Sequence, residues 1–404
     1  MSAGGAERRD RRARLRHLLW QPPRPHGEQP RERVVGPLEL FYDLVMVVLV
    51  AQAAHHLAGQ LTWRGLGEYA AVFALVWIAW TNGTLHHELH GREDARARST
   101  FLLQILVLVP LGALIPRAGG ARGAAFAVTA GLLFAVLAGL WALAARDDRP
   151  EYRRSSHLFV TGTAAFAILL GASALLPAGP RLLSWGLLDA AYLVGYNAAL
   201  LAGTPAQQAA LTITNALIER FGLLIIIVLG ETVTGIVDGL AHKPADARTL
   251  AVALLTVLVG FGAWWTYFDY AGHRPLRPTP TATAQWMLTH LPLTAAIAAM
   301  GAAMVSLVEH AHEPRTPAAA SWLLSAGCAT ILCTTMIIAG ALQPSPRDRT
   351  FYKPLATICA ATAAACLGLG AARPTPLLLS LGLTLLLGVP WGYAVARRTN
   401  HEGV

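Results

Sequence analysis

The sequence has 404 residues, of which 54% are hydrophobic and only 14% carry a charge. A soluble domain has about 25% charged residues, so this composition excludes an ordinary soluble protein. A net charge of +9 suggests nucleic-acid binding in a soluble protein, but here the basic residues lie in short segments between apolar blocks. We therefore predict an integral membrane protein with no nucleic-acid partner.

The apolar residues occur in blocks of about twenty, the length that a helix needs to cross a hydrocarbon core roughly 30 Å thick. The alternating strands of a membrane barrel do not occur in the sequence. These blocks predict an all-α polytopic membrane helix bundle with about twelve spans. The predicted spans are residues 38–58, 66–86, 100–118, 121–145, 157–176, 181–201, 217–238, 247–270, 286–309, 318–342, 352–371 and 375–396.

The N-terminal segment is basic and Pro-rich, and it contains no apolar signal-peptide core. Residues 7–20 end in apolar side chains, so they form either a basic helix on an anionic leaflet or a disordered tail. Residues 21–30 are predicted to be a flexible linker. The four cysteines lie inside apolar blocks, where a thiol behaves as a small hydrophobic group. They form no CxxC pairs and have no histidine ligands nearby, so we predict neither disulfides nor a zinc site.

Lysine and arginine residues predict the orientation of the spans. With both termini in the cytoplasm, the cytoplasmic segments carry 23 of these residues and the opposite side carries 8. Cytoplasmic loops of membrane proteins are enriched in such residues, so we predict that both termini are cytoplasmic.

An even number of spans also allows two parallel six-helix halves, as in transporters built from repeats. Residues 38–41 resemble residues 218–221, and Trp80-Thr81 resembles Trp265-Thr266. Matches this short also arise by coincidence in a biased composition, so both explanations stay open. The predicted organisation is a basic tail (1–37), a first half (38–201), a linker (202–216), a second half (217–396) and a C-terminal tail (397–404).

Several short stretches, taken together, are similar to one protein family. The stretch Glu39-Leu40-Phe41-Tyr42-Asp43-Leu44-Val45 resembles the start of the bacterial low-temperature-requirement A (LtrA-type) membrane proteins, with Met46 a mild departure. Three further stretches fit: Glu219-Arg220-Phe221-Gly222 with Leu229-Gly230-Glu231, Trp264-Trp265 with Tyr267-Phe268-Asp269, and His290-Leu291-Pro292. The resemblance implies a polytopic protein of the bacterial cell membrane, linked by name to growth in the cold, with no established activity.

Ionisable and polar residues inside the spans are the candidate functional groups. From the predicted depths, one belt in the inner half of the membrane contains Asp43, Asn82, His86, Arg220, Asp269 and His290. Glu231 lies about 18 Å beyond Glu219 along its helix, near the midplane, where burial favours the protonated acid. We predict proton or substrate binding by Glu231, Asp43, His290, Asn82, His86 and Asp269, and structural ion pairs for Glu39, Glu219 and Arg220.

Structural explanations stay open for these residues. A helix kink with a satisfied histidine explains His290 as well as a ligand site does, because Pro292 follows it. Packing explains Asp43 and Glu231 as well as function does. His55-His56 is interpreted as the outer end of the first span.

A metal site is the weaker interpretation of a second pattern. His86, His90 and Asp94 are spaced four apart and could present three ligands on one helix face, but Gly91 stands where HExxH motifs have their second histidine. We therefore predict a polar helix end and no metal. No phosphate-binding loop, nucleophile elbow or dinucleotide fingerprint occurs in the sequence, so we predict no catalytic residues and no cofactor.

Three functions fit these features. The first is a secondary transporter, proton-coupled, for a small solute or lipid-like molecule, which requires polar groups around a cavity. The second is a membrane-embedded enzyme acting on lipid, which requires a polar cluster at one leaflet with a lateral opening. The third is a sensor or scaffold linked to growth in the cold, in which every buried acid is paired and no cavity exists. The predicted partners are the bilayer and an unidentified substrate, and a homo-oligomer stays open.

Overall fold

The computed structural model describes residues 21–25, 28, 35–92, 94–210, 213–241, 246–272, 274–343 and 348–402. In these ranges the chain is helical, with twelve helices of at least 20 residues and a single isolated β-bridge. The predicted all-α class is confirmed. The helix considered for residues 7–20 lies outside the described residues.

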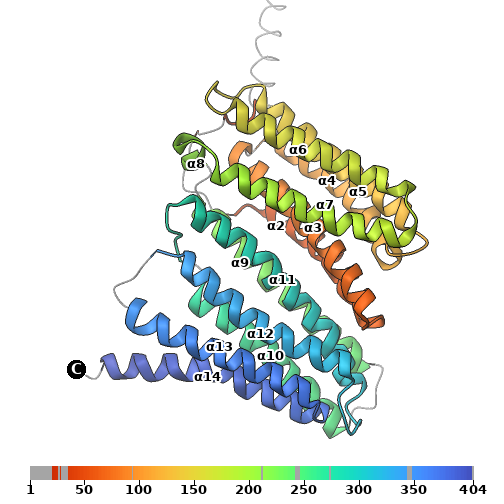
Figure 1. Ribbon diagram of the computed structural model, residues 1–404, viewed down its shortest axis with the longest axis vertical. Coiled ribbons are helices and arrows are strands. Elements are labelled where there is room, and N and C mark those ends of the chain that lie inside the picture. The colour runs from red at the N-terminus through yellow and green to blue at the C-terminus, as the bar shows by residue number, and fades with distance from the viewer. Residues whose placement is uncertain are drawn as a thin grey trace, which may run out of the picture. The chain divides into compact units, whose positions relative to one another are not determined.

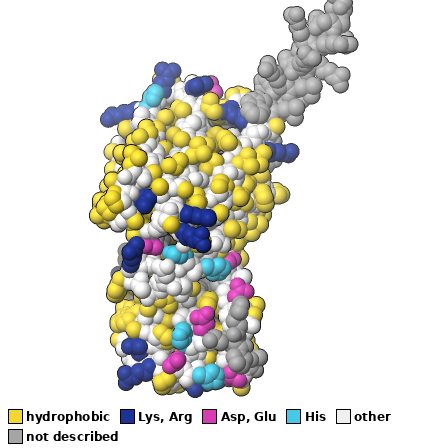
Figure 2. Space-filling view, turned by 90° about the vertical axis from the view of Figure 1, so that its right-hand side faces the viewer, with side chains coloured by type: hydrophobic (Ala, Val, Ile, Leu, Met, Phe, Trp, Pro, Cys, Tyr) yellow, Lys and Arg dark blue, Asp and Glu magenta, His cyan; other side chains and the backbone are white. Residues whose placement is uncertain are grey.

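Ten of the described helices are long and apolar enough to cross a membrane, and each falls on a predicted span. The two remaining predicted spans fall on α3 (Trp63–His90) and α7 (Ala178–Leu201), which carry more polar side chains, such as Asn82 and Asp189. In Figure 2, hydrophobic side chains form wide areas and Lys and Arg side chains lie in separate groups between them. Such a surface suits a helix bundle in a bilayer.

The helices belong to two compact units, which we describe separately. Unit 1 comprises Met1–Met46 and Leu75–Thr212, and unit 2 comprises Val47–Ala74 and Ile213–Val404. Helix α2 (Pro37–Gly59) and helix α3 therefore contribute residues to both units. A short helix, α8 (Pro205–Ala210), occupies part of the predicted linker. The predicted internal repeat stays a prediction.

In unit 1, consecutive helices pack against one another (Figure 1). They are α4 (Ala95–Leu114), α5 (Gly123–Ala145), α6 (Arg153–Ala172) and α7, with 3-10 turns at Ile115–Arg117 and Ser173–Leu175. A glycine lets α5 and α6 approach closely, because a Cβ at Gly131 would lie 2.9 Å from the Ala167 carbonyl oxygen. Small residues at such crossings are typical of membrane helices, where packing replaces the hydrophobic effect between helices.

Unit 2 is built around its most buried long helix, α11, which packs on α9, α10 and α12. Its helices are α9 (Asn215–Ala241), α10 (Ala247–Tyr270), α11 (Pro280–Glu309), α12 (Ala318–Ala341), α13 (Asp348–Ala372) and α14 (Pro376–Glu402). Side-chain caps begin two of them: Asp246 accepts from the backbone of Thr249 before α10, and Thr279 accepts from Ala282 before α11. The last helix returns to α10, where the Tyr270 hydroxyl donates to the Pro390 carbonyl at 2.9 Å.

Candidate functional sites in the two units

A buried polar contact joins α2 and α3 in unit 1. The Trp80 indole Nε1 donates to Asp43 Oδ1 at 2.7 Å, and both side chains are almost completely buried. Nearby, the Tyr42 hydroxyl donates to Gln104 Oε1 of α4 at 2.9 Å. Gly83 makes room for this bond, because a Cβ there would lie 2.6 Å from the Tyr42 hydroxyl oxygen. The sequence therefore places a glycine where three helices meet around two polar side chains.

A second set of polar side-chain contacts connects α3, α6 and α7. The Tyr192 hydroxyl donates to Asn82 Oδ1 at 3.0 Å and lies 3.1 Å from Thr163 Oγ1. Asn82 Nδ2 in turn donates to the Ile78 carbonyl at 3.1 Å. Thr163 and Tyr192 also line a groove of about 370 Å³ between α6 and α7, whose other walls are mainly apolar. We call this feature the α6–α7 groove.

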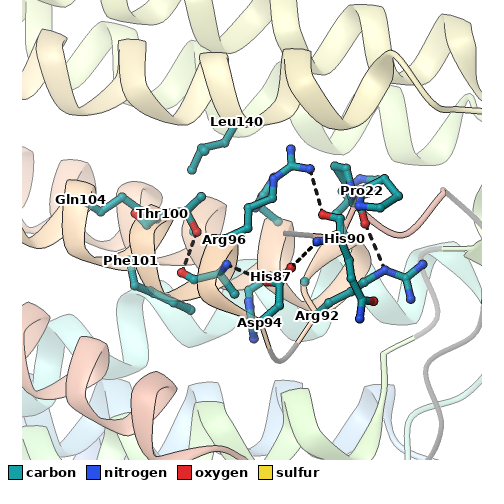
Figure 3. Close-up of a pocket in the computed structure, with 16 residues that line it drawn as sticks. Pro22, His87, His90, Arg92, Asp94, Arg96, Thr100, Phe101, Gln104 and Leu140 are labelled. Atoms are coloured by element: carbon teal, nitrogen blue, oxygen red, sulfur yellow. Dashed lines mark hydrogen bonds between the residues drawn. The ribbon is translucent and has the colours of Figure 1, made fainter. Parts of the chain in front are cut away.

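A smaller cavity of about 30 Å³ lies where α3 ends and α4 begins (Figure 3). His86, His87 and His90 line it from α3. The rings of His86 and His90 both lie edge-on to Trp141 of α5, and His86 Nε2 has no hydrogen-bond partner among the described residues. His87 Nε2 lies 3.7 Å from Glu39 Oε1 on α2. This end of α3 is therefore a cluster of imidazoles with a carboxylate beside it.

Residues 21–25 lie across this cavity. Gln21 donates its backbone N–H to Asp94 Oδ2 at 2.8 Å, and Arg24 donates a guanidinium N–H to the Glu88 carbonyl at 2.6 Å. Arg92 donates to the Pro22 carbonyl at 3.0 Å (Figure 3). Residues 21–25 of the predicted flexible linker thus make hydrogen bonds to α3, to α4 and to the residues between these helices, while the flexibility of the linker stays a prediction.

The histidine pattern does not form a metal site in the described part of the chain. His90 Nδ1 makes a 2.7 Å hydrogen bond with the Arg24 carbonyl, which occupies one of its two nitrogens. Asp94 caps α4 by accepting from the Ala97 N–H. Among the described residues, no group of three His, Cys, Asp or Glu side chains is arranged to hold a metal ion.

In unit 2, Glu231 of α9 faces a histidine. Its Oε1 lies 3.9 Å from His55 Nε2 on α2, and the two side chains are 28% and 46% exposed, respectively. Both residues line a cavity of about 20 Å³, which is enough for one water molecule. The distance is too long for a direct hydrogen bond, but a single bridging water can connect the two groups.

Small residues create this cavity. Gly235 and Gly301 line it from α9 and α11. A Cβ at Gly301 would lie 3.1 Å from the Thr232 methyl group, and one at Gly235 would lie 3.0 Å from the Val305 side chain. The two helices therefore pack as closely as their backbones allow beside Glu231, and a larger side chain at either position would fill the space.

Two further polar residues of unit 2, His290 and Asp269, have partners on nearby helical turns. His290 is completely buried, with Nδ1 at 2.7 Å from the Trp286 carbonyl and Nε2 at 3.0 Å from the Tyr267 hydroxyl. Asp269 accepts from the indole of Trp265, one turn earlier on α10, at 2.9 Å. Arg220 is buried and Glu219 is half-buried on the first turns of α9.

The family model described as Bacterial low temperature requirement A protein (LtrA) matches residues 34–389. The chain belongs to the LtrA family. This confirms the resemblance found in the sequence and extends it to residue 389, beyond the last of the motifs that carry the resemblance. No curated protein matches the chain.

The six residues of the predicted belt belong to different units. Asp43, Asn82 and His86 lie in unit 1, while Arg220, Asp269 and His290 lie in unit 2. Within unit 1 the hydrogen bond of Asp43 goes to Trp80, and that of Asn82 goes to Tyr192. The roles of these residues stay predictions.

Sequence reasoning missed one buried acid. Asp189 lies in the middle of α7 and is 3% exposed, and neither of its carboxyl oxygens has a hydrogen-bond partner in the part of the chain that the structure describes. The sequence does mark Asp189, because it is an acidic residue inside an apolar block, and the same feature identified Glu231 as a candidate. The partnership of Glu231 with His55 was also missed, because the two residues are far apart in the sequence.

Proposed function

We propose that this LtrA-family protein is a proton-coupled secondary transporter of a small solute or lipid-like molecule, and that Glu231 is its proton-binding group. The chain belongs to the LtrA family and has a multi-pass helical architecture, which is compatible with a transporter. Acids inside membrane helices commonly serve proton or ion pathways. The observation that carries the proposal is the Glu231–His55 pair beside a cavity with room for one water.

The geometry of this pair suits proton exchange better than structural ion pairing. A proton can pass between a carboxyl group and an imidazole through one bridging water. Partly exposed ion pairs contribute about 0–1 kcal/mol to stability, and this one lies at the distance limit for such a pair. The pair therefore adds little to folding, whereas its residues have the chemistry to bind and release a proton.

A scaffold function has less support. A scaffold needs its buried acids paired, since an unpaired one costs stability without any benefit. Asp189 is buried and has no partner among the described residues, and cavities occur in both units. These features favour a protein that moves protons or ligands.

A lipid-acting enzyme is the second candidate, because the α6–α7 groove opens beside the Thr163 and Tyr192 hydroxyls. A lipid chain would fit such an apolar groove. However, among the described residues the only titratable side chains that line it are Tyr192 and Tyr196, and no His, Cys, Asp or Glu, the commonest groups for general acid–base catalysis, reaches its walls. Transport therefore has the better support.

We place the protein in the bacterial inner membrane with both termini in the cytoplasm, on the strength of the distribution of lysine and arginine. Reporter fusions test this orientation. Fusions after Arg98, Arg154 and Arg349 should give a cytoplasmic signal, and fusions after Arg122 and Lys243 should give an external one. An external signal after Arg349 would contradict the orientation of the last helices.

Glu231→Gln tests the proton-binding role. The full-length variant is reconstituted in liposomes that contain a pH-sensitive dye, and proton-linked flux is followed with a panel of solutes. We expect the flux to be lost while the free energy of unfolding stays within about 1 kcal/mol of wild type, because the pair is partly exposed. Asp238→Asn is a matched control, since Asp238 is an exposed acid seven residues further along α9.

Two results contradict the proposal. If Glu231→Gln keeps proton-linked flux with its pH dependence intact, Glu231 is not the proton-binding group. If the variant instead loses about 3–5 kcal/mol of stability, the acid is a buried ion-pair partner and its role is structural. Loss of flux in both variants would point to a general effect of removing negative charge from α9.

A further inference from the structure

Asp189 is a membrane-embedded acid that the proposed function does not use. It lies eleven residues after Ala178, the first residue of α7, and twelve before Leu201, the last. At 1.5 Å per residue it is about 17 Å from the start of its helix. The side chain is 3% exposed, and within the described ranges of the chain neither carboxyl oxygen has a hydrogen-bond donor. Buried carboxylates are normally paired or hydrogen-bonded, so this environment requires an explanation.

Among the described residues, the parts of the neighbouring helices that pack beside the middle of α7 carry no charged side chain. Helix α7 packs on α6, on the turn Ser173–Leu175 and on α8, and it contacts α5 through Trp185 and α3 through Tyr192. From residue 163 to 175, throughout α5 and α8, and from residue 75 to 85 of α3, the sequence contains no Asp, Glu, Lys, Arg or His.

The titratable groups closest along α7 are also engaged elsewhere. Arg181 is two turns away, and its guanidinium lies against the start of α5, where a Cβ at Gly123 would be 2.9 Å from Arg181 Cζ. The Tyr192 hydroxyl is used by Asn82 and Thr163, and the ring of Tyr196 packs on Phe159. In unit 1, Asp43 of α2 is bonded to Trp80. Neither a cation nor an N–H group compensates a charge on Asp189.

The geometry points to a proton-binding site at Asp189, with the carboxyl group holding a proton in the conformation described. A lone carboxylate in this position would lose its hydration without any compensating hydrogen bond, which disfavours the charged form. A metal ion is a poor fit, because hard cations such as Ca²⁺ and Mg²⁺ take six or more oxygen ligands. A proton needs only the carboxyl group itself.

The position of Asp189 also separates it from the α6–α7 groove. Its neighbours Leu188 and Tyr192 line the groove, but Asp189 does not. Side chains on a helix are spaced by about 100° per residue, so Asp189 projects away from the groove wall that Leu188 forms. Exchange of its proton therefore requires a conformational change that brings water or a proton acceptor to this face of α7.

This inference concerns unit 1 and does not rest on the role of Glu231, which lies in unit 2. Infrared difference spectroscopy of the full-length protein in liposomes at pH 7 tests it directly. The wild-type minus Asp189→Asn difference should contain the C=O stretching band of a protonated carboxyl group, and the band should shift in D₂O. The same band should remain in Glu231→Gln, so a failure of one proposal is distinguishable from a failure of the other.

A stability measurement gives an independent test. If Asp189 is neutral and has no partner, Asp189→Leu should unfold at the same temperature as wild type or higher, because an apolar group replaces a buried polar one. Asp189→Asn should also remain folded. The matched control is Asp43→Leu, which should lower the unfolding temperature because it removes the acceptor of the Trp80 indole.

Three results would overturn the inference. The first is a difference spectrum that shows only ionised carboxylate bands. The second is a large drop in unfolding temperature for Asp189→Asn or Asp189→Leu, which would mean that a charged partner depends on the acid. The third is a carboxyl band that disappears when Na⁺ is added at constant pH, which would assign the site to a cation in place of a proton.

Discussion

Replacing Trp80 by phenylalanine should reveal the contribution of the buried bond between α2 and α3. Trp80→Phe removes the indole N–H that Asp43 accepts at 2.7 Å and leaves that carboxyl oxygen without this donor in a buried site. Hydrogen bonds to charged groups contribute about 1.5–3 kcal/mol. The variant also loses stability because a phenyl ring is smaller than an indole ring and packs less surface. The same substitution at a second buried tryptophan measures this packing contribution separately.

Trp141 of α5 is the matched control. It is also buried in unit 1, at 3% exposure against 1% for Trp80, but its Nε1 has no hydrogen-bond partner among the residues that the structure describes. Trp141→Phe therefore loses ring area without losing a hydrogen bond. We expect Trp80→Phe to reduce the free energy of unfolding by about 1.5–3 kcal/mol more than Trp141→Phe does.

The assay is equilibrium unfolding of both variants in mixed detergent micelles, with a double-mutant cycle of Trp80→Phe and Asp43→Asn. The cycle should give a coupling energy between the two residues within the usual range of about 0.5–3 kcal/mol. Equal destabilisation by the two tryptophan variants, or no coupling in the cycle, would refute the reasoning.

The other predictions test packing, hydrogen bonding and pH dependence. Tyr192→Phe should cost about 1–3 kcal/mol in the same unfolding assay, because it leaves Asn82 Oδ1 without its donor, and an unchanged stability would contradict this. Gly131→Ala should cost about 1–3 kcal/mol by overpacking against α6, whereas Gly139→Ala on the same helix, with open space around it, should be neutral or stabilising. Hydrogen bonds from His312 and Thr249 hold the pKa of Asp246 well below its usual range, so its stabilising contribution is present above about pH 4 and is lost as the pH falls further. Asp246→Asn, which keeps an N-cap, should therefore show a smaller drop in unfolding temperature than wild type between pH 5 and pH 3, and identical slopes would count against the pair.

The positions of the helices follow from the sequence because hydrocarbon thickness fixes the length of an apolar block. This is why the predicted spans coincide with helices, including α3 and α7, whose polar side chains lower their hydropathy. The same rule says nothing about which helices share a compact unit. The boundary between the units falls inside helices α2 and α3. A division of the chain at its loops, as in the predicted halves, therefore cannot find this boundary.

The hydrogen-bond partners of residues inside the spans were harder to predict. The position of a residue along its helix gives its depth in the membrane, but it does not give the direction in which the side chain projects. The predicted belt places Asp43 at the depth of Asn82 and His86, yet its hydrogen bond goes to Trp80, only two residues from Asn82. Two residues correspond to about 3 Å along the helix, which the long indole ring easily bridges. The depth argument therefore found the correct region of α3, but side-chain length and helix rotation decided the partner.

Asp189 and Glu231 satisfy the same sequence criterion, so what separates them is their surroundings. Glu231 has an imidazole at 3.9 Å and space for a water, and a group in that setting can exchange a proton without any large movement. Asp189 has neither, so a proton bound there exchanges only when the packing around α7 changes. By this reasoning Asp189 is better suited to sense the conformation of unit 1, and Glu231 is better suited to exchange protons within unit 2.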